Sequence, residues 1–129
     1  MPFIAEGGGF MYLHECLQGD DERYYPMCGV IEGKCHKTSR PQNFGYINML
    51  ADSGNMLFRA GDKVNAHSFH YWSSDSPKAS LTLKKPGRDR QWKETACGDS
   101  FYGGMPHLFF RGNPDIIKRF VWRCAEWKN

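Results

Sequence analysis

The first residues of the chain have the layout of a nucleophile elbow, a turn that lifts one reactive side chain to the start of a helix. A short apolar run at residues 3–5 leads into three glycines at positions 7–9, and a helical pattern follows. Ala5 and Gly9 flank the tip, where strand and helix crowd together. Such an elbow serves covalent catalysis. The tip itself is Gly7, which offers no nucleophile.

A resemblance to a known family gives this elbow a context. Residues 5–13 resemble the segment that carries the catalytic cysteine of class I glutamine amidotransferase domains, above all in the cobyrinic acid a,c-diamide synthase family, and that cysteine matches Gly7. Four further segments resemble the family in the same order: residues 25–33, 40–46, 66–71 and 107–114. The resemblance implies an α/β (or α+β) fold. We expect the C-terminal half of a glutamine amidotransferase-like (flavodoxin-like) domain, with a mixed sheet, an elbow helix and a C-terminal amphipathic helix.

The chemistry that the resemblance implies is hydrolysis of the side-chain amide of glutamine. A thiolate attacks the amide, and a histidine takes the thiol proton and then serves the leaving ammonia. By resemblance His107 is this histidine. Backbone N–H groups at the elbow stabilise the oxyanion, which suggests a substrate-binding role for Gly8 and Gly9. Phe109 stands where the family has a second histidine.

A second group of candidate substrate-binding residues, His67, His70 and Tyr71, lies in the segment that flanks the active site in the family. Residues three apart on a strand point to opposite faces, so His67 and His70 cannot easily grip one metal ion. We therefore expect no metal site and no cofactor. Ser68 replaces an acidic residue of the family pattern.

The remaining pattern predicts a mixed arrangement of strands and helices. We expect strands at residues 2–5, 27–31, 44–51, 63–72, 79–85, 91–96 and 106–110, and a short helix at 9–18. Asn113 and Pro114 are typical of a helix start. One helical face, with Trp127 near it, is then expected to pack in the core: Ile116, Ile117, Phe120, Val121 and Cys124.

Composition predicts one small cytoplasmic unit. The 129 residues are 40% hydrophobic and 24% charged, which are globular values. We see no targeting signal and no apolar run of membrane-spanning length, and we expect no membrane partner. The five cysteines are odd in number and scattered, so we interpret them as reduced thiols. The net charge of +3 arises mostly from residues 84–93. We interpret this run as a solvated hairpin tip, not a nucleic-acid site.

Residues 1–129 are expected to form a single partial amidotransferase-like domain. The sequence has no phosphate-binding loop and lacks the glycine-rich turn that precedes the elbow in the family. Three interpretations remain: a truncated synthase-like chain that is inactive alone, a subunit completed by another chain and driven by free ammonia, or a non-catalytic module that binds glutamine, a tetrapyrrole or a protein. An unpaired edge of a mainly parallel sheet predicts a homo-oligomer or pairing with a synthase chain.

The elbow also carries a geometric prediction. Gly7 should have a positive φ, which glycine adopts without the strain of a side chain. His107 should lie across from it, within reach of a side chain at position 7.

Overall fold

Two sheets build the molecule, and the computed structural model describes residues 1–76 and 80–128 of it. The smaller sheet has three strands in the order β1 (Phe3–Glu6), β9 (Phe101–Gly104) and β8 (Thr95–Cys97). β1 runs parallel to β9, whereas β8 is antiparallel to β9. Gly103 and Gly104 of β9 are buried, because the side chains of Phe10, Leu13 and Tyr102 fill the space beside them.

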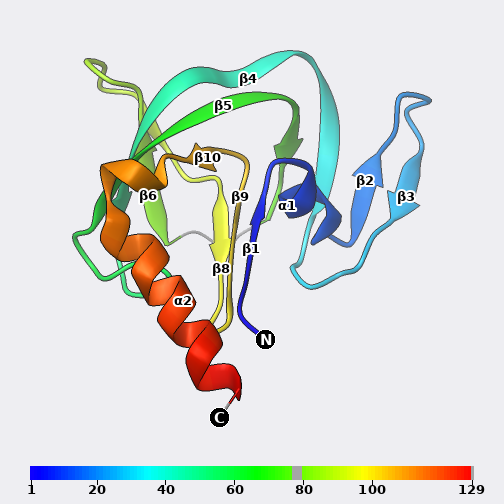
Figure 1. The fold of residues 1–129 in the computed structure, drawn as a ribbon. Helices are drawn as coiled ribbons and strands as arrows, with labels where there is room; N and C mark the ends of the chain where they lie inside the picture. Colours follow the sequence, from blue (N-terminus) through cyan, green and yellow to red (C-terminus); the bar gives the residue numbers. More distant parts are fainter. Residues whose placement is uncertain (77–79, 129) are drawn as a thin grey trace.

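The larger sheet has seven strands among the residues that the structure describes, and it is strongly curled. Two long strands dominate it, β4 (Lys34–Ala51) and β5 (Lys63–Ser74), which arch side by side over the rest of the molecule (Figure 1). Their antiparallel register shifts between Lys37 and Gly45, and such bulges bend a strand. The remaining strands pair along these two: β2 (Cys16–Gln18), β3 (Tyr24–Pro26), β6 (Leu81–Lys84), β7 (Gln91–Trp92) and β10 (His107–Leu108).

Three helical segments of the described chain complete the fold. α1 (Gly8–Tyr12) follows β1 directly, and the 3-10 turn η1 (Phe110–Gly112) leads into the C-terminal helix α2 (Pro114–Lys128). The largest core cluster joins β4, β5 and β6 to Ile116 of α2, and it includes Met56, Leu57 and Phe58 from the loop that connects β4 to β5. No helix in the described part of the chain is long and apolar enough to cross a membrane.

The structure confirms a mixed α/β architecture and corrects several predicted elements. No strand forms at residues 27–31: Gly29 has φ +66°, and the backbone N–H groups of Met27, Cys28 and Ile31 bond instead to the chain around the end of α1. The helix predicted at 9–18 ends at Tyr12, since residues 16–18 form β2 against β4.

Other predicted strands are shorter or divided. The strand predicted at 91–96 is two strands in different sheets, β7 and β8, and the one at 106–110 ends after Leu108. Residue 79 of the predicted strand 79–85 lies outside the described residues, and β6 covers 81–84. The hairpin between β6 and β7 is confirmed, with Gly87 at φ +70° in its turn.

Two further expectations were wrong in part. The described strand pairs are mostly antiparallel, and only β1–β9 and β2–β4 are parallel. The apolar face of α2 is buried only near its start, because the helix runs away from the core: Ile116 is fully buried, whereas Val121 and Trp127 are exposed. The side chain of Asn113, the residue before α2, donates to the Lys63 carbonyl of β5.

Candidate functional site

The elbow at the end of β1 has the backbone geometry that the sequence predicts. Gly7 has φ +54° and ψ −118°, between the last residue of β1 and the first of α1. Its N–H donates to the Gly104 carbonyl of β9, and its carbonyl accepts the Met11 N–H of α1, both at 3.0 Å. The turn is therefore fixed by the small sheet on one side and by the helix on the other. Gly8 and Gly9 form the exposed first turn of α1.

His107 lies directly across from this turn, as predicted. A Cβ atom at position 7 would stand 3.1 Å from His107 Nε2 and 3.3 Å from its Cε1. These distances are slightly tighter than ordinary van der Waals contact. The His107 side chain is 62% exposed, so its ring has room to shift by the few tenths of an ångström that a side chain would need.

Glu6 orients the His107 ring and was missed by the sequence analysis. Its Oε2 lies 3.2 Å from His107 Nδ1, and its Oε1 accepts the Leu108 N–H at 3.0 Å. When the ring is neutral, a carboxylate at Nδ1 favours the tautomer that carries its proton there, which leaves the Nε2 lone pair facing position 7. The Glu6 contacts join β1 of the small sheet to β10 of the large one. The family pattern alone gives no such signal, because the contact depends on how the two sheets meet.

A row of rings continues from His107 across the outer face of the large sheet. His107 pairs with His67, which pairs with Tyr46, so the three side chains share one face of β10, β5 and β4. The Tyr46 and His67 ring centroids are 5.4 Å apart. Beside this row lies a hollow of about 420 Å³, lined also by Asn65, Ala66, Leu108 and Phe109.

The other two predicted residues of β5 lie apart from this group. His70 points to the opposite face and is buried, with Nε2 3.0 Å from the Glu94 carboxylate and Nδ1 2.6 Å from the Trp72 carbonyl. Burial lowers the pKa of His70, but Glu94 and the carbonyl raise it by more, so the pKa lies above its ordinary value. Tyr71 is partly exposed on the face of His67, farther along β5, where its ring contacts Phe69.

The structure therefore brings together Gly7, His107, Glu6 and His67, and it separates His70 from them. The alternation of β5 accounts for this division, since residues 67 and 70 cannot share a face. Among the described residues no three His, Cys, Asp or Glu side chains are grouped to hold a metal ion. The group holds an acceptor nitrogen aimed at an elbow tip and a carboxylate behind it. Such an arrangement could accept a proton from a nucleophilic side chain at position 7, where this chain has a glycine.

Comparison with known proteins identifies relatives of the chain. A cobyrinate a,c-diamide synthase from Caldanaerobacter subterraneus subsp. tengcongensis is 30% identical over 98% of this chain, which corresponds to 28% of that protein's length. Similar synthases from Dehalococcoides mccartyi and Picrophilus torridus are 32% and 34% identical over 94% and 95% of the chain. No family model matches the chain. It spans just over a quarter of the length of these curated relatives, at 26–28%. By this similarity over nearly all of its residues, the chain belongs to the cobyrinate a,c-diamide synthase family.

Proposed function

We propose that this chain is the glutaminase part of a cobyrinate a,c-diamide synthase-like protein and that it has lost its nucleophile at position 7. The observation that carries the proposal is the distance of 3.1 Å between a Cβ at position 7 and His107 Nε2, at an elbow with φ +54°. In this proposal the family reaction is the glutamine-dependent amidation of side-chain carboxylates of a tetrapyrrole. The isolated chain does not hydrolyse glutamine, because Gly7 supplies no thiol.

The surrounding groups suit the proposed chemistry. A thiol at position 7 would give its proton to His107 Nε2, and the imidazolium would be stabilised by the Glu6 carboxylate at Nδ1. The N–H groups of Gly8 and Gly9, at the start of α1, are our candidates for holding the oxyanion. His67 and Tyr46 border the hollow beside His107, where we place the bound glutamine or the acceptor.

Restoring the thiol tests this proposal. In the Gly7→Cys variant we expect the introduced thiol to react with iodoacetamide near neutral pH, because His107 withdraws its proton; an ordinary thiol has a pKa of about 8.5. Peptide mass spectrometry separates this site from the five native cysteines. Gly8→Cys is the matched control, since a Cβ at position 8 would meet no atom of the described residues within 4 Å. Identical pH profiles for the two variants, or no change in the Gly7→Cys profile on His107→Ala, would contradict the proposal.

Glutamate release tests whether the restored site is sufficient. We expect no glutaminase activity from the wild-type chain. Gly7→Cys should acquire activity only when mixed with a full-length synthase that supplies the remaining segments. Measurable release by the wild-type chain alone, abolished by His107→Ala, would show that the nucleophile lies elsewhere.

A non-catalytic assembly subunit is the second candidate function, and the edge of the small sheet favours it. Within the described residues β1 pairs only with β9, so its other edge is open to a further strand. Val121, Trp122 and Trp127 of α2 are exposed as well. We expect a dimer, or a complex with a synthase chain, in light scattering of the pure protein and of mixtures. A monomer in both samples at high concentration would rule this out.

A further inference from the structure

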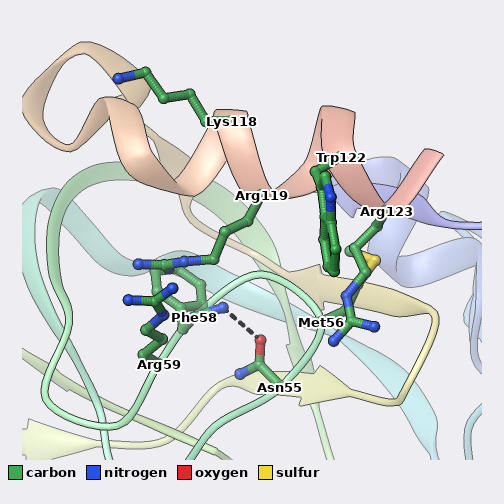
Figure 2. Close-up of a pocket in the computed structure, with 8 residues that line it drawn as sticks. All are labelled: Asn55, Met56, Phe58, Arg59, Lys118, Arg119, Trp122 and Arg123. Atoms are coloured by element: carbon green, nitrogen blue, oxygen red, sulfur yellow. Dashed lines mark hydrogen bonds between the residues drawn. The ribbon is translucent and has the colours of Figure 1, made fainter. Parts of the chain in front are cut away.

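A second hollow, which shares no lining residue with the one beside His107, lies between α2 and the loop that joins β4 to β5. It measures about 440 Å³, which is within the usual size range of small-molecule sites. We call it the cationic groove; loop residues 55–59 form one wall and α2 residues 118–123 form the other (Figure 2). Met56 and Phe58 are almost fully buried beneath it.

The loop wall of the groove is held in one conformation by hydrogen bonds. Asn55 Oδ1 accepts the N–H groups of Leu57 and Phe58 at 2.9 and 3.0 Å. The Leu57 carbonyl accepts from Arg119 Nη1 at 3.0 Å, which ties the loop to α2. The walls are therefore formed before any ligand binds, so binding orders few groups.

Among the described residues that line the groove, every charged side chain is a cation: Arg59, Lys118, Arg119 and Arg123. Asp62 pairs closely with Arg119, at 2.6 Å, whereas the carboxylates near Lys118 and Arg123 stand 3.7 and 3.9 Å away and are exposed. Such exposed pairs are weak. Figure 2 shows the side chains of Arg59 and Arg119 together beside Phe58. This concentration of positive charge favours an oxyanion, and guanidinium groups bind phosphate with two parallel hydrogen bonds.

The groove also offers one broad aromatic surface. Trp122 is 58% exposed, and its ring descends from α2 toward Met56 with Arg123 beside it (Figure 2). The Arg123 guanidinium lies 5.7 Å from the ring centroid. Exposed indole rings beside cations stack well on flat heteroaromatic rings, whereas an inorganic anion would leave the ring unused.

From these features we infer that the cationic groove binds a phosphate ester of a flat heteroaromatic group, of the size of a mononucleotide. The phosphate lies against Arg59 and Arg119, and the base stacks on Trp122. This site is separate from the elbow and does not depend on the function proposed for His107.

Isothermal titration of the full chain tests the inference with three probes: adenosine 5′-monophosphate, adenosine and inorganic phosphate. We expect the nucleotide to bind at least tenfold more tightly than either part alone. Arg59→Gln and Trp122→Leu should each weaken nucleotide binding at least tenfold. Arg88→Gln, at the exposed β6–β7 turn, and Trp127→Leu, on the same helix, are matched controls and should bind as the wild type does.

A chemical-shift titration of the wild-type protein gives a readout that does not depend on variant folding. Amide signals of residues 55–59 and 118–123 should move with added nucleotide. No binding at millimolar nucleotide, equal affinity for the nucleotide and for phosphate, equal affinity for adenosine, or shifts confined to other segments would each overturn the inference.

Discussion

Replacing Gly7 with alanine should destabilise the fold, while the same change one residue later should not. At position 7 the backbone has φ +54° and ψ −118°, which costs a residue with a side chain about 1–3 kcal/mol. The added Cβ would also press against His107 Nε2 at 3.1 Å. Gly8 begins α1, and a Cβ there would meet no atom within 4 Å among residues 1–76 and 80–128. Gly8→Ala should therefore stabilise the protein by up to about 0.5–1 kcal/mol.

The two variants should differ by about 1.5–4 kcal/mol in the free energy of unfolding, from the sum of the two effects. For a chain of this length that corresponds to a separation of about 6–16 °C in Tm. Urea unfolding followed by circular dichroism measures the difference, and equal m-values would show that both variants unfold from comparable states. Adding His107→Ala to Gly7→Ala removes the contact and leaves the backbone strain. Equal stability of Gly7→Ala and Gly8→Ala would refute the strained elbow.

Three further predictions concern the groups around the site. Leu108→Ala should lower the unfolding free energy by about 2–4 kcal/mol in urea titrations, and the neighbouring Phe109→Ala by less than about 1, because Leu108 is 8% exposed and Phe109 55%; comparable losses would contradict the assigned faces. The pKa of His70 lies above 6.5 in the folded chain, so its stabilisation is complete below pH 6.5 and is lost as the pH rises through that folded value. Glu94→Gln should flatten this loss of stability at rising pH. Burial lowers the pKa of His14, so His14→Gln should change the pH dependence of stability only below pH 6.5. Burial raises the pKa of the Cys35 thiol to about 12, so native alkylation at about pH 8 followed by mass spectrometry should label exposed Cys28 and spare Cys35; labelling of both at equal rates would disprove this.

The elbow and its histidine were predictable because each is marked by a short local motif, and the motifs follow one another in a fixed order along the sequence. The glycine run fixes the turn at position 7, and the segment around His107 keeps its place relative to that turn. The structure supplies the φ of Gly7 and the distance to His107 that the pattern predicts. The assignment of catalytic roles remains a prediction.

Features that depend on tertiary contacts could not be predicted in this way. The sequence gives no periodic signal for Met56, Leu57 and Phe58, which are buried although they lie in a loop. Glu6 reaches His107 only because two sheets meet there. The exposure of Val121 on α2 follows from where the helix leaves the core, whereas helical periodicity reports only which residues share a face.

Because β10 pairs with β5 in a defined register, the His107 side chain can face only outward or inward. β10 has only two residues, and Leu108 faces the core where His107 faces outward. A slip of one residue would exchange them, turning the imidazole inward and the leucine into water. Intermediate placements have no hydrogen-bonded register, so a weakened core would produce two populations of molecules, one with the histidine aimed at the elbow and one without it. Loss of the site would then lower the fraction of molecules whose histidine is aimed at the elbow, while the geometry within those molecules stays the same. The two populations would give paired NMR signals for the His107 ring.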